Sequence, residues 1–596
     1  MAKRMIEKYK KQATALLTLS MAAVLITGCS TKNTNNSGNG SNQESSGVVG
    51  NETTDTSDSA EDNFEGTTIA LSDNGITVNG EAVSKDSDEA VYVGADIVYY
   101  EEGKDDSYGE GSEEDAHSAE EAAKHTVITI TQPGEYKISG NISYGQIAID
   151  LGEDAKKDEN AVVTLILDNA KITCTVAPAI VVYNAYECGS DDTKTATSSV
   201  DTTNAGFNLV LADDSVNEVS GCHVAKIYKE GTTDKLHKYD AAIDSKVSFN
   251  INGETKGNGQ LTVNSDNEGI SSNLHMTVNG GLITINASDD SINTNEDGVS
   301  VFTMNGGVLT CDSGNGSEGD GIDSNGWIVI NGGYIIASAN SDSQDSGVDS
   351  DNGIFINGGT VLATGNMYDE VSSESKQSFV VLNFNEKQSE ETYILLKDSD
   401  GNAVTAFNAV NDYSMLVYSS PEVAEGDYTL YQVSSVTGDL NGSIYTNITA
   451  YEGEQQLQYT SNSMMGGGMG GPGGGMGQPG GGQKPGDGEA PEMPTEGQAP
   501  ADGEAPEMPT EGQAPADGGT PEMPTEGQAP ADGGTAEMPT EGQALADGEA
   551  PEMPTDGQKP ADGQMPGGLQ TTGEASTVFT FTTGRNTFSG ISVVSE

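Results

Sequence analysis

The stretch from Asn279 to Gly307 reads NGGLITINASDDSINTNEDGVSVFTMNGG, and it begins and ends with the same three residues. The Asn-Gly-Gly triplet recurs every 26 residues, at Asn279, Asn305, Asn331 and Asn357, and an Asn-Gly pair at Asn252 precedes the series. Apolar and polar residues alternate on both sides of each triplet. Alternation with a period of two is typical of short strands that bury one face. Each repeat is therefore expected to contain two strands joined at the Asn-Gly corner.

A third short strand is expected where another pattern repeats in step with the triplets. Its apolar column consists of Ile243, Ile270, Ile292, Ile322 and Val348, and a small hydroxyl residue follows two positions later in each copy. Three short strands cannot enclose a core alone, so successive copies must stack as parallel strands about 4.8 Å apart. The sequence thus predicts an all-β fold, a parallel β-helix (solenoid) with C-terminal β strands. Its glycine corners supply positive φ, and stacked asparagines can form an amide ladder.

The basic, apolar and small residues of segment 1–28 follow one another as in a bacterial lipoprotein signal peptide. Basic residues precede an apolar run that ends at Ile26-Thr27-Gly28-Cys29. This ending resembles the lipobox, in which the cysteine is acylated and becomes the mature N-terminus. We expect lipidation of Cys29 to anchor the protein to the extracellular face of the bacterial cell membrane. An ordinary signal peptide with a chance cysteine is the alternative.

Composition divides the rest of the chain. Residues 29–65 are rich in Ser, Asn and Gly, and residues 461–575 form a Gly-, Met-, Pro- and Glu-rich repeat. Such segments bury too little apolar surface to fold, so we expect a disordered stalk and a long disordered linker. The folded domain is expected to span residues 66–460. Residues 576–596 alternate aromatic and hydroxyl residues, and they either rejoin the domain as a β segment or form a disordered end.

Charge and cysteine content exclude some functions. The formal net charge is −67, and Arg4 and Arg585 are the two arginines of the chain. Such a chain cannot neutralise phosphates, so no nucleic-acid partner is expected. The four cysteines other than Cys29 fit no zinc spacing, and their disulfide pairing is not deducible from the sequence.

Acidic residues gather in the turns around the third strand. Carboxylates stacked at the spacing of the repeats repel one another unless a cation lies between them. A donor set of oxygen atoms alone suits Ca²⁺, although a solvated acidic turn is the alternative. The candidate metal ligands are Glu268, Asp289, Asp290, Asp320, Asp323, Asp345, Asp349 and Asp351.

The repeats favour a binding role over catalysis. Residues 257–375 contain seventeen Asp and Glu residues and no Lys or Arg, whereas polysaccharide lyases commonly use such a base beside Ca²⁺. Because of the lysines from Lys226 to Lys246, lyase activity remains an alternative. Paired carboxylates leave hydrolase activity as another. Three aromatic residues, Trp327, Tyr334 and Phe355, are expected to point outward as carbohydrate contacts. Packing beneath the C-terminal strands is the alternative for them.

Three stretches carry a family resemblance: ITITQPGEYKISGNISYGQIAID from Ile128, VTLILDNAKITC from Val163, and DAAIDSKVSFNINGETKGNGQLTVNSDNEGISSN from Asp240. They resemble a family of bacterial surface carbohydrate-binding domains that was formerly a domain of unknown function. The resemblance covers roughly Thr126 to Thr460. It implies a right-handed parallel β-helix similar to pectate lyases, bound calcium, and binding of plant cell-wall polysaccharide without an established reaction. The stretch DDSINTNED departs from the family pattern, so ligand positions do not transfer residue by residue.

The expectation is therefore a lipid-anchored, monomeric, extracellular protein that binds polysaccharides such as cellulose or pectate. We expect it to bind calcium and to be non-catalytic. One alternative is a calcium-dependent polysaccharide lyase or hydrolase that acts on pectic sugars. The other is a surface adhesion or spacer protein.

Overall fold

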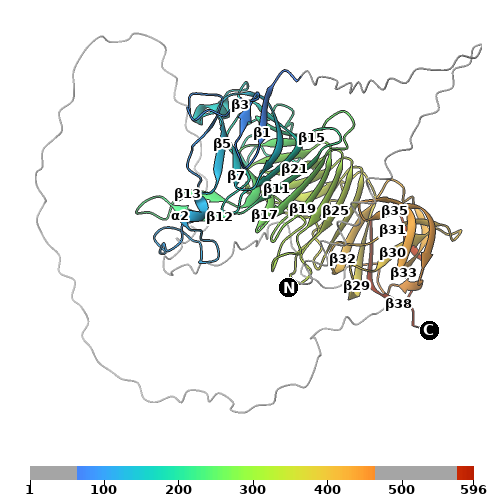
Figure 1. The fold of residues 1–596 in the computed structure, drawn as a ribbon. Coiled ribbons are helices and arrows are strands. Elements are labelled where there is room, and N and C mark those ends of the chain that lie inside the picture. The colour runs from blue at the N-terminus through green and yellow to red at the C-terminus, as the bar shows by residue number, and fades with distance from the viewer. Residues whose placement is uncertain (1–63, 464–573, 596) are drawn as a thin grey trace, which may run out of the picture. The chain divides into compact units, whose positions relative to one another are not determined.

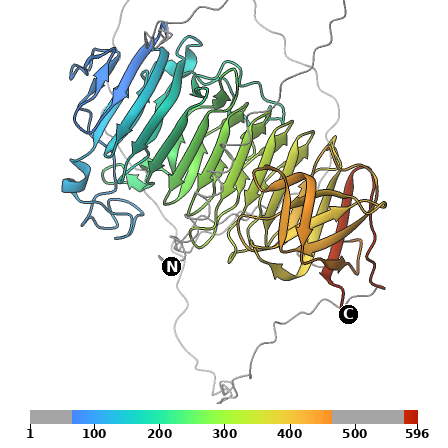
Figure 2. The ribbon, with the colours of Figure 1, turned by 45° about the vertical axis from the view of Figure 1, so that its right-hand side comes forward.

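The structure is a computed structural model that describes residues 64–463 and 574–595. Cys29 and nearly all of the two predicted linkers lie outside these residues. The described chain is mostly β, and its two helices are short, α2 (Ala119–Ala122) and the 3₁₀ helix η1 (Glu153–Lys157). Parallel strands stack into long sheets, and a smaller β assembly lies at the C-terminal end of the stack (Figures 1 and 2). The predicted mostly-β class is confirmed, and the long parallel sheets are consistent with a β-helix.

Three columns of parallel strands run along the stack. The first contains β6 (Gly134–Ile142), β8 (Val163–Thr173), β10 (Phe207–Leu211), β15 (Phe249–Gly253), β18 (His275–Val278), β21 (Val301–Met304), β24 (Trp327–Ile330) and β27 (Gly353–Ile356). The second contains the end of β8, then β11 (Val216–Gly221), β16 (Gln260–Ser265), β19 (Leu282–Asn286), β22 (Val308–Asp312), β25 (Tyr334–Ser338) and β28 (Thr360–Gly365). The third contains β5 (Thr126–Ile130), β7 (Gly145–Asp150), β9 (Ile180–Asn184), β14 (Ala241–Ser245), β17 (Glu268–Ser272), β20 (Ile292–Thr294), β23 (Ile322–Ser324) and β26 (Asp349–Ser350).

The register of the third column follows the sequence repeat. Ile270 pairs with Ile292, and Ile292 pairs with Ile322. All three side chains are completely buried in the main core. A buried isoleucine contributes roughly 2 kcal/mol relative to an exposed one, so these apolar columns hold successive coils together.

The corners of the coils are built by the Asn-Gly-Gly triplets. Asn305 donates a hydrogen bond from Nδ2 to Oδ1 of Asn279 at 2.9 Å and accepts one from Asn331 at 3.0 Å. The same bond links Asn279 to Asn252 and Asn357 to Asn331. The second glycine of the triplet has a φ of +85° at Gly307 and +77° at Gly333. The predicted amide ladder and the predicted positive-φ corners are confirmed.

The N-terminal end of the stack is covered by strands that precede the repeats. β1 (Thr67–Leu71) pairs in parallel with β6, and β2 (Thr77–Val78) and β3 (Glu81–Ala82) extend it as an antiparallel ribbon. β4 (Val91–Val93) closes the third column by antiparallel pairing with β5. Such coverage protects sheet edges from further pairing. A hairpin of β12 (Val224–Tyr228) and β13 (Lys235–Tyr239) interrupts the coil between β11 and β14.

The C-terminal assembly begins where the parallel stack ends. Its strands are β29 (Phe379–Gln388), β30 (Tyr393–Lys397), β31 (Ala403–Phe407), β32 (Tyr413–Ser419), β33 (Gly426–Val433), β34 (Ser435–Asn441), β35 (Ile444–Glu452), β36 (Gln455–Gln458), β37 (Phe579–Phe581) and β38 (Arg585–Val593). β32 pairs antiparallel with both β28 and β29, so it joins the stack to the assembly. Sequence reasoning left residues 576–596 open, and the structure pairs β38 with β29 and β37 with β33.

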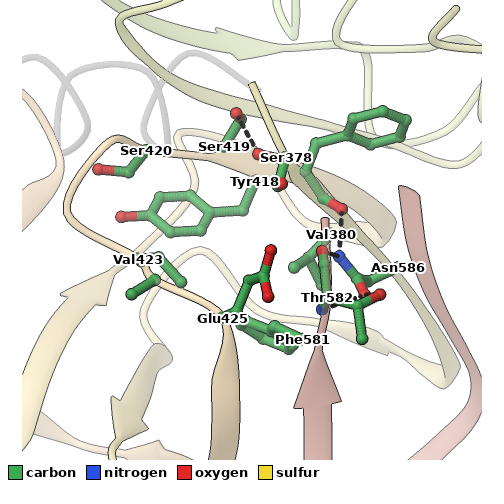
Figure 3. Close-up of a pocket in the computed structure, with 12 residues that line it drawn as sticks. Ser378, Val380, Tyr418, Ser419, Ser420, Val423, Glu425, Phe581, Thr582 and Asn586 are labelled. Carbon is green, nitrogen blue, oxygen red and sulfur yellow. Dashed lines mark hydrogen bonds between the residues drawn. The ribbon is translucent and has the colours of Figure 1, made fainter. Parts of the chain in front are cut away.

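A small cavity marks the seam between these strands (Figure 3). Tyr418, Glu425 and Phe581 are among its lining residues, and its volume is about 20 Å³. Beside it, Asn586 Nδ2 donates to the carbonyl oxygen of Phe379 at 3.3 Å. A space of this size has room for about one water molecule, so it is no sugar site.

Substitution of a corner glycine tests whether backbone contact between coils limits stability. A Cβ atom at Gly333 would lie 2.8 Å from the carbonyl oxygen of Gly307, whereas a Cβ at Gly401, which also has positive φ, meets nothing within 4 Å. Gly401→Ala should cost about 1 kcal/mol of unfolding free energy through its φ alone. Gly333→Ala should cost about 1 to 2 kcal/mol more, since the next coil must move. Urea denaturation of both variants measures the difference, and equal losses would show that the coil contact is unimportant.

Candidate metal centre

Three aspartates meet at the edge of the third column. Asp323 in β23 pairs in register with Asp349 at the start of β26, and Asp320 lies just before β23. One carboxylate oxygen from each lies within 4.8 Å of the others, and all three residues are half-buried. We call Asp320, Asp323 and Asp349 the aspartate triad. In the described part of the chain this triad is the group of acidic, His or Cys side chains that could hold a metal ion.

The triad is electrostatically unfavourable without a cation. Burial, followed by repulsion from Asp349 and Asp351, raises the pKa of Asp323 to about 8. Burial and the nearby Asp369 raise the pKa of Asp349 to about 7. The pKa of Asp320 is also raised well above its ordinary value, through burial and the charges of Asp349 and Asp323. Bringing these ionised carboxylates together therefore costs free energy that a bound cation would recover.

A second acidic group lies one to two coils earlier, at Glu268, Asp289 and Asp290. Asn293 Nδ2 donates to Glu268 Oε1 at 3.1 Å and to Asp290 Oδ2 at 3.4 Å. Burial is the main cause of the raised pKa of Glu268 and Asp290, and it raises the pKa of Asp289 to about 6. Oε2 of Glu268 and Oδ1 of Asn293 are buried without a hydrogen-bond partner. Buried oxygens without partners are unfavourable, but among the described residues these three carboxylates do not converge as those of the triad do.

The remaining two candidate ligands lie outside the triad. Oδ2 of Asp345 accepts hydrogen bonds from the backbone of Gly319, at 2.7 Å, and from the hydroxyl of Ser343. Asp345 thus ties neighbouring turns together. Asp351 is exposed, two residues beyond Asp349.

Sequence reasoning missed Asp369, whose Oδ2 accepts a hydrogen bond from the backbone N–H of Ser350 at 3.1 Å. Its charge contributes to the raised pKa of Asp349. Asp369 follows the last Asn-Gly-Gly triplet, where no further copy exists for alignment. No repeat signal in the sequence could therefore place it beside the triad.

One earlier coil shows how a similar charge is neutralised by the protein itself. Asp244 lies in β14, which precedes the triad in the third column of strands, and Lys246 Nζ lies 2.7 Å from its Oδ1. The coils that carry the triad contain no basic residue, because residues 257–375 lack Lys and Arg. A cation from solution would neutralise the carboxylates of the triad, as Lys246 neutralises that of Asp244.

The donor set determines which cation fits. Three carboxylates supply part of the six to eight oxygens that Ca²⁺ takes, and Ca²⁺ tolerates irregular geometry better than Mg²⁺. Water, backbone carbonyls or oxygens of a ligand would have to fill the other positions. The three carboxylates of the triad therefore fit a calcium ion.

The three predicted carbohydrate contacts occupy two different surroundings. Trp327 begins β24 opposite Gly353, and Phe355 lies diagonally from it on β27; both are half-buried. Tyr334 begins β25 and packs against the core of the C-terminal assembly. The structure thus places Trp327 and Phe355 on neighbouring strands and separates Tyr334 from them.

The protein is mostly β, with stacked parallel sheets and an acidic edge. Comparison with known proteins shows which family it is similar to. Residues 124–392 match the family described as "Carbohydrate-binding domain-containing protein". A protein of that description from Acetivibrio thermocellus is 30% identical over 161 residues, which cover 27% of this chain and 45% of the relative. The predicted resemblance to a carbohydrate-binding domain family is confirmed over residues 124–392. The chain spans less than half the length of the relative.

A solved structure described as the polysaccharide lyase-like protein from C. thermocellum, gadolinium derivative, also shows similarity. It shares 20% sequence identity and covers 50% of this chain and 93% of its own, with a TM-score of 0.28. A score this low carries no argument about the present chain.

Replacing one triad aspartate should affect stability in opposite directions with and without calcium. In metal-free protein, Asp323→Asn removes a repelling charge and should raise the free energy of unfolding by about 1 to 3 kcal/mol. With excess Ca²⁺ the wild type should gain stability, and the variant should gain much less. Urea denaturation with calcium and after its removal measures both effects.

Asp400→Asn is the matched control, because Asp400 is exposed in the turn between β30 and β31. It should change neither the metal-free stability nor the calcium response. A wild-type protein whose unfolding ignores calcium would contradict a metal site at the triad.

The raised pKa values also predict a pH dependence. In the metal-free folded protein, Asp323 and Asp349 titrate near pH 8 and 7, against an ordinary value of 3.8. Between about pH 4 and 8 the folded state holds protons that the unfolded chain has released, so metal-free stability should fall as pH rises. Calcium competes with these protons, so its stabilising effect should grow over the same range. Thermal unfolding of metal-depleted protein at pH 5 and pH 8 tests this, and a metal-free protein more stable at pH 8 would contradict it.

Proposed function

We propose that the protein is a lipid-anchored, extracellular polysaccharide-binding protein that uses calcium and is non-catalytic. The match of residues 124–392 to a carbohydrate-binding domain family supports the general role. The half-buried aspartate triad supports the use of calcium and is the observation that carries the proposal. We infer a right-handed coil for the β-helix, because parallel strands connected within one sheet are nearly always joined with that handedness.

Calcium would let this acidic surface bind an acidic glycan such as pectate. The chain has a net charge of −67, so a uronate carboxylate is repelled by it in the absence of a cation. An ion held by Asp320, Asp323 and Asp349 has further coordination positions that a sugar carboxylate can fill. The ion therefore both removes the repulsion within the triad and provides the attractive contact.

Neutral glycans such as cellulose need apolar contact instead of charge. Trp327 and Phe355 lie on neighbouring strands of the first column, and both are half-buried. Partly exposed rings at this spacing can stack on the apolar faces of successive sugars, as amphipathic aromatic side chains do at interfaces. These two residues are the proposed neutral-sugar contacts on the stack, and Tyr334, which packs against the C-terminal assembly, is not included.

The lysines upstream of the repeats favour binding over lyase chemistry. Lys246 is paired with Asp244 at 2.7 Å, Lys238 with Asp240 at 3.0 Å, and Lys226 with Glu110 at 2.8 Å. A lyase base must be free to take the proton next to the uronate carboxyl group. These three of the five lysines from Lys226 to Lys246 are already held by a carboxylate, so they support the non-catalytic proposal.

The proposed location depends on the N-terminal segment and not on the folded domain. The lipobox-like ending at Cys29 supports acylation, and acyl chains would hold the domain at the cell surface. Within the described residues, no helix is long and apolar enough to cross a membrane. Monomeric binding at the surface is part of the proposal.

Retention on polygalacturonate tests the proposal directly. The full chain without its first 28 residues should be retained on insoluble polygalacturonate with calcium and released by chelator, and no unsaturated uronide absorbance should appear. Asp349→Asn should weaken retention by about tenfold, which corresponds to 1.4 kcal/mol of lost binding free energy. Asp400→Asn should be retained like the wild type.

Each result has a distinct meaning. Steady release of unsaturated product would replace binding with lyase activity. Retention that is insensitive to both chelator and Asp349→Asn would remove calcium from the binding mechanism. Loss of retention on every polysaccharide tested would leave the adhesion or spacer role.

A further inference from the structure

An open groove lies at the N-terminal end of the domain, away from the aspartate triad. One wall is the segment 97–108, and the other is the hairpin of β12 and β13, which Figure 1 shows near α2. Its volume is about 710 Å³, which is within the range of sites that bind small molecules. Segment 97–108 precedes the part of the chain that matches the carbohydrate-binding family, residues 124–392.

The two walls of the groove are joined by backbone contacts, so its shape is fixed in advance. The Tyr228 N–H donates to the carbonyl oxygen of Tyr108 at 2.8 Å, and the Glu110 N–H donates to that of Lys226 at 2.9 Å. The backbones approach so closely that a Cβ at Gly109 would lie 2.2 Å from the Lys226 oxygen. A groove held in this way loses little conformational entropy when it binds a ligand.

Aromatic and apolar side chains form the lining of this groove. They include Tyr99, Tyr108, Tyr228, Leu236 and His237. The Tyr228 hydroxyl donates to Glu110 Oε1 at 2.9 Å, and His237 Nδ1 lies 3.1 Å from the Tyr239 hydroxyl. Leu236 is 50% exposed. Lys226 Nζ lies 5.4 Å from the centre of the Tyr228 ring. The lining thus offers aromatic rings and an exposed apolar side chain to a ligand.

The charges of the lining exclude an acidic ligand. Glu101, Asp105 and Glu230 contribute carboxylates to the groove. Of the described lining residues, Lys104 alone is a lysine or arginine, and its Nζ lies 2.7 Å from Glu101 Oε2. The same Nζ lies 4.9 Å from the centre of the Tyr108 ring. A uronate or phosphate would therefore find no free cation here, whereas carboxylates readily accept hydrogen bonds from sugar hydroxyls.

We propose that this groove is a second glycan site, which binds a neutral oligosaccharide without calcium. The sugar rings stack on the aromatic lining, and their hydroxyls donate hydrogen bonds to the groove carboxylates. The site differs from the triad in position and in ligand charge. It would give the domain a contact for neutral chains at its N-terminal end, separate from Trp327 and Phe355 on the stack and from the triad.

Isothermal titration of the full chain, lacking only residues 1–28, against three hexasaccharides in chelator tests the proposal. The probes are cellohexaose, which is neutral, hexagalacturonate, which is anionic, and the glucosamine hexasaccharide, which is cationic. We expect cellohexaose to bind, hexagalacturonate to bind at least about tenfold more weakly, and the glucosamine hexasaccharide to bind no more tightly than cellohexaose. Because chelator removes calcium and cellohexaose has no carboxylate, the result is independent of the triad.

Variants locate the binding in the groove. Tyr228→Ala and Leu236→Ala should each weaken cellohexaose binding by about tenfold, whereas Tyr228→Phe keeps the ring and should bind like the wild type. Tyr144→Ala is the matched control, because Tyr144 is 46% exposed and lies outside the groove. Unchanged unfolding temperatures would show that the variants are folded.

Three outcomes would overturn the proposal. The first is no binding of cellohexaose in chelator, which leaves polygalacturonate retention at the triad unaffected. The second is cellohexaose binding that survives both Tyr228→Ala and Leu236→Ala. The third is tighter binding of either charged probe, which would assign the groove to a ligand of another chemistry.

Discussion

Parallel stacking places each residue of one coil above its counterpart in the next, and most features of this protein follow from that constraint. For isoleucine the result is favourable, since Ile270, Ile292 and Ile322 fill one continuous core. For asparagine it is also favourable, because each amide has both a donor and an acceptor and can bond to identical groups above and below. For aspartate the same alignment is unfavourable, because a carboxylate offers only acceptors and a negative charge. Stability and the candidate metal site thus arise from one geometric rule acting on different side chains.

This rule explains why the fold could be predicted from the sequence over the repeats. The spacing of Asn279, Asn305, Asn331 and Asn357 determines both the coil length and the residue that lies above each position. The amide ladder, the positive φ at Gly307 and Gly333, and the pairing of Asp323 with Asp349 all follow from that spacing. Beyond the last repeat there is no spacing from which neighbours can be predicted. The position of Asp369 and the pairing of β38 with β29 could therefore not be predicted in this way.

The site was predicted less completely than the fold, for a physical reason. Column alignment identifies carboxylates that lie near one another, but it does not show which hydrogen bonds they already make. Asp345 and Asp320 both accept a backbone hydrogen bond from a neighbouring coil, but only Asp320 also has an oxygen close to those of Asp323 and Asp349 in the described part of the chain. The groove between segment 97–108 and the β12–β13 hairpin depends on contacts between irregular segments, such as that of Gly109 with Lys226. Those contacts have no period, so they leave no signal in a single sequence.

The return of the chain to the C-terminal assembly has a topological consequence. Tyr459 and Ser576 form a β-bridge, so the described chain on both sides of residues 464–573 meets on one surface. Closing a loop of that length costs about 4 kcal/mol, and the buried Phe579, Phe588 and Ile591 contribute roughly 2 kcal/mol each. β37 and β38 therefore belong to the same assembly as β29 and β33, although residues 464–573 separate them in the sequence. A single cut of the chain between Ser463 and Glu574 leaves β37 and β38 held by their sheet pairing, so the nicked protein remains one particle although it has become two chains.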